Sequence, residues 1–162
     1  MNKEGIKFFD KNINRRGAIT DKKILYFKGT DVPMPSIFEI SNSGMCNRKC
    51  SFCPRSDPSY NHVNEFISQK LHDKIYKELN DNNFSGSIIF SGFVEPLLDK
   101  RIYSQIKDIR EKLPGANIEL ITNGDPLNHE RTEKLFDCGL SYLLVSAYDS
   151  EEQAKGFREL LS

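Results

Sequence analysis

The stretch "SIFEISNSGMCNRKCSFCPRS" (residues 36–56) joins a short apolar segment to a loop that holds three of the four cysteines of the chain. Cys46, Cys50 and Cys53 have the spacing C-x-x-x-C-x-x-C, and the aromatic residue Phe52 precedes the third. In a reducing compartment, cysteines gathered this closely are more often metal ligands than disulfides. The stretch therefore predicts a β-strand that leads directly into a metal-binding loop.

The composition is that of an ordinary globular chain. Its 162 residues are 38% hydrophobic and 28% charged, and the formal net charge is zero. A single domain of this size buries about 70% of the surface that its unfolded chain exposes. A zero net charge provides no field that would recruit nucleic acid or an anionic membrane. The sequence has no apolar run near the roughly 20 residues of a membrane span, and its first residues lack a signal-peptide pattern. We therefore expect a cytoplasmic protein without membrane or nucleic-acid partners.

Strand-like and helix-like segments alternate along the chain. The apolar strand candidates are residues 36–41, 86–92, 116–124 and 141–147. Helical patterns follow them, with Ser68, Asp99 and Asn128 as expected N-caps. The expected inward-facing helix residues are Leu71, Ile75 and Leu79, then Ile102, Ile106, Ile109 and Leu113, and finally Ala154, Phe157 and Leu160 or Leu161. This alternation predicts an α/β fold with a parallel sheet.

The unusual residues all fall where a predicted strand ends. Residues 46–53, 92–96, 123–124 and 146–148 follow the four strands in turn. The carboxyl ends of parallel strands meet at one edge of a sheet, and ligands collect there. The sequence therefore predicts one site built from four loops.

Three clustered cysteines do not complete an ordinary metal site. Structural zinc and electron-transfer clusters normally have four protein ligands. Cys138 lies three residues after Leu135 on a predicted helix, so we expect it in the core. A 4Fe–4S cluster held by three thiolates would keep one iron open to a small molecule.

The cysteine loop resembles that of the radical SAM superfamily, whose signature is C-x-x-x-C-x-aromatic-C after the first strand of a partial (β/α) barrel. The resemblance covers about residues 36–150. It implies that Cys46, Cys50 and Cys53 hold a 4Fe–4S cluster and that S-adenosylmethionine chelates the fourth iron. It also implies a reaction in which a 5′-deoxyadenosyl radical abstracts hydrogen from a peptide or small-molecule substrate. An electron donor such as flavodoxin or ferredoxin is implied as well.

The segment "FSGFVEPLL" (90–98) is similar to the Gly-Gly-Glu-Pro element of that superfamily. Gly92 permits close approach of the backbone, Glu95 supplies negative charge for a ligand ammonium, and Pro96 restricts Glu95 to an extended conformation. Val94 departs from the glycine that many relatives have there.

Softer candidates complete the expected cofactor site. By resemblance, Asn123 and Ser146 contact the ribose and methionine parts of S-adenosylmethionine, and the backbone of Phe52 contacts adenine. A turn residue, a strand-end serine and a packing aromatic are the simpler interpretations. The histidines and Arg55 have no ligand spacing and are expected at the surface or in packing: His62, His72 and His129.

The resemblance divides the chain into an N-terminal extension, residues 1–35, and a radical SAM core, residues 36–162. About four of the six βα units of the family are present, and the core ends early compared with relatives that carry a C-terminal SPASM or twitch part. We expect a homo-oligomer or a partner chain to complete the barrel, since an open sheet edge invites association. The alternatives are a non-catalytic module that binds zinc or an iron–sulfur cluster, and an inactive truncated radical SAM relic.

Overall fold

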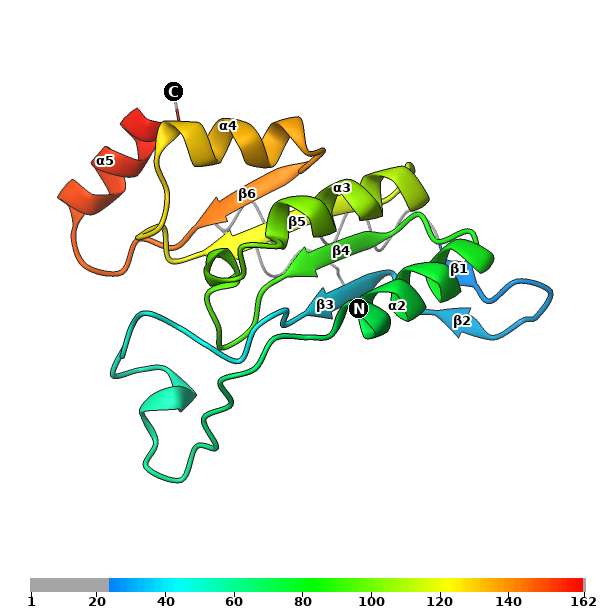
Figure 1. Cartoon of the computed structure of the whole chain (residues 1–162), viewed down its shortest axis with the longest axis horizontal. Helices are drawn as coiled ribbons and strands as arrows, with labels where there is room; N and C mark the ends of the chain where they lie inside the picture. Colours follow the sequence, from blue (N-terminus) through cyan, green and yellow to red (C-terminus); the bar gives the residue numbers. More distant parts are fainter. Residues whose placement is uncertain (1–23, 162) are drawn as a thin grey trace, which may run out of the picture.

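A parallel sheet forms the centre of the computed structural model, which describes residues 24–161 (Figure 1). Its strands are β3 (Ile37–Ile40), β4 (Ser87–Phe90), β5 (Asn117–Thr122) and β6 (Tyr142–Val145), in the order β3-β4-β5-β6. Each neighbouring pair is parallel. The four predicted strands are therefore confirmed, and the sheet of the described residues is open rather than closed into a barrel.

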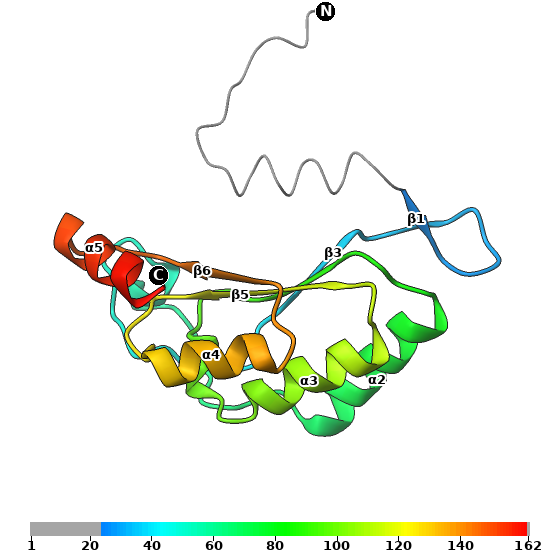
Figure 2. The ribbon, with the colours of Figure 1, turned by 90° about the horizontal axis from the view of Figure 1, so that it is seen from above.

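Each strand of this sheet leads into a helix. The helices are α2 (Gln69–Asp81), α3 (Ile102–Lys112), α4 (His129–Asp137) and α5 (Glu151–Leu160). Figure 2 shows α2, α3 and α4 on one face of the sheet, with α5 beyond β6. The predicted α/β fold with four βα units is confirmed. Within residues 24–161, none of the helices is long and apolar enough to cross a membrane.

The core lies between the sheet and these helices. Neighbouring strands place their apolar side chains at the same level, as the pairs Phe38–Ile88 and Ile88–Ile118 show. Opposite them, Ile106 and Ile109 of α3 have no exposed surface. Burying each such side chain stabilises the fold by about 1.5–3 kcal/mol. The core therefore fixes the strand ends from which the site is built.

The helix starts agree with the sequence in two of three places. The side chains of Ser68 and Asn128 accept hydrogen bonds from the backbone N–H groups of Leu71 and Arg131, as expected of N-caps. The expected cap Asp99 is wrong, because the N-cap of α3 is Arg101. The helix starts later because the carboxylate of Asp99 instead accepts three hydrogen bonds from the backbone and guanidinium of Arg101, at 2.8–3.0 Å.

Two inward faces differ from the expectation. In α2 the buried residues are His72, Tyr76 and Leu79, whereas Leu71 is 46% exposed. The helix is turned because the Tyr76 ring fills the core, with the His72 ring 5.4 Å from it. Three residues of α5 are only half-buried: Ala154, Phe157 and Leu160. Leu161 is exposed, because α5 lies beyond the edge strand β6.

The segment before the sheet contributes a small hairpin. Strands β1 (Leu25–Tyr26) and β2 (Pro33–Met34) pair antiparallel. Leu25 and Met34 belong to the buried core. Residues 1–23, most of the expected N-terminal extension, lie outside the described residues, so its boundary stays a prediction.

Candidate functional site

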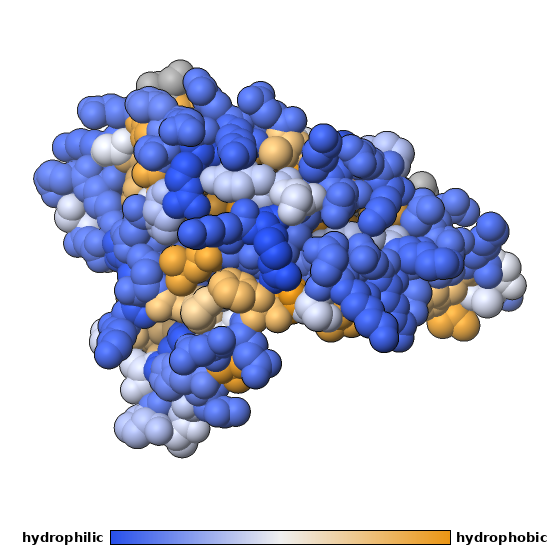
Figure 3. All heavy atoms as spheres, in the orientation of Figure 1, coloured by the Kyte–Doolittle hydropathy of each residue, from blue (hydrophilic) through white to orange (hydrophobic). Residues whose placement is uncertain are grey.

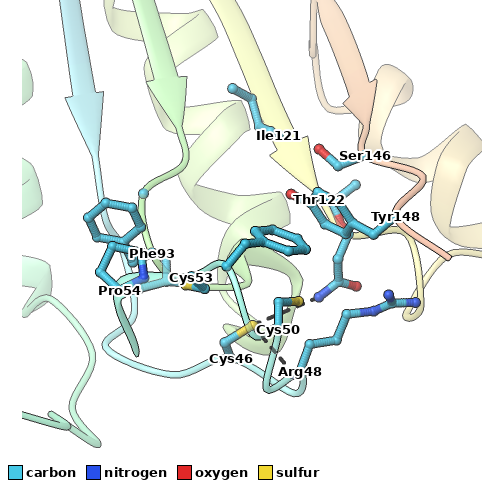
Figure 4. A pocket seen from close by; sticks show the side chains of 14 residues that line it. Cys46, Arg48, Cys50, Cys53, Pro54, Phe93, Ile121, Thr122, Ser146 and Tyr148 are labelled. Atoms are coloured by element: carbon cyan, nitrogen blue, oxygen red, sulfur yellow. Dashed lines mark hydrogen bonds between the residues drawn. The ribbon is translucent and has the colours of Figure 1, made fainter. Parts of the chain in front are cut away.

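The four loops predicted to meet do line one pocket, of about 270 Å³, at the carboxyl edge of the sheet (Figure 4). The cysteines and Arg48 come from the loop after β3, while Thr122 and Ser146 come from the ends of β5 and β6. The pocket is lined by Cys46, Arg48, Cys50, Phe52, Cys53, Pro54, Gly92, Phe93, Val94, Ile121, Thr122, Asn123, Ser146 and Tyr148.

All three clustered cysteines face this pocket as free, half-buried thiols. The loop turns between them because the N–H of Cys53 donates to the carbonyl of Cys50 at 3.0 Å. A short 3-10 helix, η1 (Pro54–Ser56), follows Cys53. Within the described residues, no three His, Cys, Asp or Glu side chains are grouped so as to hold a metal ion. Cys138 is the C-cap of α4 and packs against the core, away from this loop.

Gly92 occupies a position that other residues would strain. Its φ is +117°, and a Cβ there would lie 2.3 Å from the hydroxyl oxygen of Ser41. Three residues later, the N–H of Glu95 donates to the carbonyl of Met45 at 2.8 Å. These contacts hold the 91–95 segment directly against the cysteine loop.

Glu95 lies behind the pocket wall rather than in it. Only 1% of the residue is exposed, and its carboxylate accepts bonds from Leu97 N–H, Thr122 Oγ and Asn123 N–H at 3.0, 2.8 and 2.9 Å. Burial raises the pKa of Glu95, although these three donors oppose the shift. Glu95 therefore joins the β4 and β5 loops.

Pro96 is also buried behind the wall. It begins the 3-10 helix η2 (Pro96–Leu98). Its carbonyl accepts a bond from the side-chain amide of Asn42 at 3.3 Å. Asn42 lies between β3 and the cysteines, so Pro96 also contributes to holding that loop.

Asn123 and Ser146 line the pocket from the ends of β5 and β6. The amide nitrogen Nδ2 of Asn123 donates to Asn47 Oδ1 at 2.7 Å and approaches the sulfur of Cys46 at 3.9 Å. The N–H of Ser146 donates to the carbonyl of Thr122 at 2.9 Å. Asn123 thus connects the end of β5 to the cysteine loop.

Arg48 is the main residue of the site that sequence reasoning missed. Its guanidinium bonds to both carboxylate oxygens of Asp125, after β5, and of Asp149, after β6. Hydrogen bonds from Asp125 and Asp149 raise the pKa of Arg48, and the bond from Arg48 holds the pKa of Asp125 below its usual range. The only signal in the sequence was that both aspartates directly follow predicted strands.

Aromatic side chains form the exposed part of the pocket. Phe52, Phe93 and Tyr148 are 67%, 55% and 48% exposed. The rings of Phe52 and Tyr148 lie 5.2 Å apart across the mouth of the pocket, between the cysteine loop and the loop after β6. A ligand here would meet an apolar rim as well as three thiols.

A second pocket of about 490 Å³ adjoins the first and shares Phe93 and Val94 with it. Figure 3 shows hydrophobic side chains gathered between the body of the sheet and the projecting loop. Val63, Phe66 and Leu71 contribute exposed apolar surface to this second pocket.

Comparison with known protein families decides between the interpretations of this site. The model of the Radical SAM superfamily matches residues 40–160. The chain belongs to the radical SAM superfamily. This membership does not favour an unrelated zinc module.

Relatives within the radical SAM superfamily differ in reaction. An S-adenosyl-L-methionine-dependent 2-deoxy-scyllo-inosamine dehydrogenase of Niallia circulans is 29% identical over 113 residues, which are 70% of this chain and 45% of the relative. The dual-specificity RNA methyltransferase RlmN of Buchnera aphidicola subsp. Schizaphis graminum is 36% identical over 119 residues, covering 68% of this chain and 33% of the relative. The chain thus spans less than half the length of these relatives.

Solved structures show the same fold. BtrN in complex with AdoMet and 2-DOIA matches with a TM-score of 0.69 and 28% identity, over 78% of this chain and 50% of that chain. BtrN in an open conformation matches with a TM-score of 0.65 and 28% identity, over 76% of this chain and 56% of that chain.

The superfamily implies a 4Fe–4S cluster and S-adenosylmethionine as cofactors. The residues present fit both groups. Three thiols, the ligand type of iron–sulfur clusters, surround one pocket. Beside them lie hydroxyl and amide groups and an aromatic rim, which suit the polar and adenine parts of S-adenosylmethionine.

Proposed function

We propose that this chain is a radical SAM enzyme, or the catalytic part of one, that abstracts hydrogen from a peptide or small-molecule substrate. The observation that carries the proposal is the convergence of Cys46, Cys50 and Cys53 on one pocket. When bound, the cluster supplies an electron that splits S-adenosylmethionine into methionine and a 5′-deoxyadenosyl radical, which takes the substrate hydrogen.

The residues of this chain then bind and orient the cofactors. The three cysteines are the proposed cluster ligands. Gly92 brings backbone carbonyls close to the pocket, as a ligand ammonium requires. Glu95 and Pro96 support that segment from behind, because both are buried.

The adenosyl part of the cofactor is assigned to the ends of β5 and β6. Asn123 and Ser146 line the pocket there and have groups that bond to hydroxyls. Phe52 lies opposite them on the cysteine loop, and its backbone is the proposed adenine contact. Its exposed ring and that of Tyr148 would exclude water from the bound cofactor.

Substrate and partners extend the proposal. The second pocket, which shares Phe93 and Val94 with the first, offers room for an apolar part of the substrate. The electron donor would be a flavodoxin or ferredoxin, and the proposed location is the cytoplasm, where these thiols stay reduced. A second copy or a partner chain would cover the β6 edge, where Phe136, Tyr142 and Leu161 are more than 40% exposed.

Anaerobic reconstitution with iron and sulfide tests this function. We expect a brown protein with about four irons that, once reduced, cleaves S-adenosylmethionine. A cluster without cleavage would indicate the inactive relic, and a colourless protein with stoichiometric zinc would contradict the proposal.

A further inference from the structure

Arg48 lies inside the cysteine loop, yet its guanidinium binds two carboxylates that follow other strands. We propose that Arg48 is a positioning residue, which fastens the cysteine loop to the ends of β5 and β6 through Asp125 and Asp149 and so fixes the arrangement of the thiols before metal binds. The purpose of this arrangement rests on the function proposed above, but the fastening itself is a property of the metal-free chain.

The geometry is that of a double fork. Toward Asp125, Nε and Nη2 of Arg48 donate at 2.7 and 2.5 Å. Toward Asp149, Nη1 and Nη2 donate at 2.9 and 2.9 Å. Two-fold bonds between arginine and carboxylate fix orientation as well as distance. Lysine has no planar fork, so it cannot replace both pairs.

The burial of Arg48 separates these pairs from ordinary surface ion pairs. The Arg48 side chain is 16% exposed, whereas that of Lys77, which pairs with Asp81 on α2, is 75% exposed. Solvent and salt weaken exposed pairs until many contribute little. A shielded guanidinium between two carboxylates keeps more of its attraction, so its loss should be measurable.

Both carboxylates are themselves held in place. Asn47 Nδ2 donates to Asp125 Oδ2 at 2.9 Å. Gln153 Nε2, on the first turn of α5, donates to Asp149 Oδ2 at 2.9 Å. Each carboxylate is therefore fixed to bind Arg48, and neither must be ordered when the contact forms.

The backbone around Arg48 has few contacts of its own. Within the described residues, positions 46–49 make no backbone-to-backbone hydrogen bond. The N–H of Arg48 only approaches the sulfur of Cys46, at 3.5 Å. Side chains must therefore hold this turn, and Arg48, midway between Cys46 and Cys50, makes four of the contacts.

The first test uses the full metal-free protein and needs no activity. We compare alkylation rates of the loop thiols by iodoacetamide, with Cys138 as internal reference, in wild type, Arg48→Ala, Arg48→Lys and Asp149→Asn. Arg48→Ala should speed alkylation of the three loop thiols about tenfold, because a lost charged contact raises the population of the open loop. Arg48→Lys should show most of this effect, and Asp149→Asn a smaller part of it.

Lys49→Ala is the matched control, since it removes a positive charge from the same loop at an exposed residue. Its alkylation rates should equal those of wild type. Wild-type rates in Arg48→Ala, full rescue by Arg48→Lys, or an equal effect of Lys49→Ala would each overturn the proposal. Asp149→Asn keeps the test decisive if Arg48→Ala fails to fold.

A second measurement separates this proposal from the proposed function. In reconstituted protein, the electron paramagnetic resonance spectrum of the reduced cluster should be more heterogeneous in Arg48→Ala than in Lys49→Ala. If no variant, wild type included, cleaves S-adenosylmethionine while the alkylation difference remains, the function fails and the positioning role stands. If wild type cleaves it and Arg48→Ala matches wild type in alkylation and spectrum, the positioning role fails alone.

Discussion

The helix-facing core of the sheet and the cysteine loop are held by contacts of different kinds. Phe90 and Ile118 are fully buried in strands that bond their neighbours in regular parallel ladders. Residues 46–49 instead depend on side chains that belong to the ends of β5 and β6. The core is therefore a property of local pattern plus burial, whereas the loop is a property of a few long-range polar contacts.

This difference teaches how the two regions should fail. Damage to the core lowers the stability of the whole domain, because packing there is shared by every element. Damage to the loop should leave the domain folded and change the site alone, since local opening needs less free energy than global unfolding.

The largest effect is expected from Phe90→Ala, which should lower the free energy of unfolding by about 3–5 kcal/mol through the cavity it leaves. Urea unfolding followed by circular dichroism measures it. Phe93→Ala is the matched control three residues on, at a ring that is 55% exposed, and should change stability by less than about 0.5 kcal/mol. Equal losses in both variants would remove the distinction between core and rim.

Glu95→Ala should come next, with a loss of about 2–3 kcal/mol, because it leaves three buried donors without an acceptor. The same unfolding experiment applies. Glu111→Ala, at a side chain that is 63% exposed, provides the control and should be close to neutral. A neutral Glu95→Ala would show that the β4 and β5 loops do not need this carboxylate.

Gly92→Ala should cost about 1–2 kcal/mol, since alanine is strained at positive φ and its Cβ would collide with Ser41. Gly156→Ala is the matched control, because no atom lies within 4 Å of a Cβ added there on α5. That variant should be neutral or slightly more stable. Thermal unfolding of both variants separates backbone strain from the general effect of an added methyl group.

The smallest expected effect is a pH dependence at Glu95, whose pKa is raised in the fold by burial. A carboxyl with a raised folded pKa stabilises the fold most when protonated, so its contribution is lost as pH rises through that pKa. The stability of wild type relative to Glu95→Gln should therefore fall as pH rises above the usual range of glutamate. A difference that grew with pH would show that the three donors outweigh burial.

The sequence predicted the core more completely than the site. Alternating segments placed all four parallel strands, and the clustering at strand ends placed the pocket. It did not reveal the clamp on Arg48, because Asp125 and Asp149 are 77 and 101 residues away and only the fold brings them near. It also mistook the inner face of α2, since a periodic pattern of aliphatic residues gives no weight to Tyr76 and His72.

The inward turn of Glu95 was equally out of reach. A Glu-Pro pair fixes the backbone before the proline, but the direction of the carboxylate depends on donors supplied by another strand, Thr122 and Asn123. Local sequence therefore identified which residues matter at this edge of the sheet better than it identified what each one contacts.

Iron content after anaerobic reconstitution of Cys50→Ala and Cys138→Ala tests the central claim most directly. The account predicts about four irons and a spectrum that changes on addition of S-adenosylmethionine in wild type and Cys138→Ala, and loss of the cluster in Cys50→Ala. A cluster that needs Cys138, or one that survives in Cys50→Ala, would contradict the assignment of three loop cysteines and an open iron.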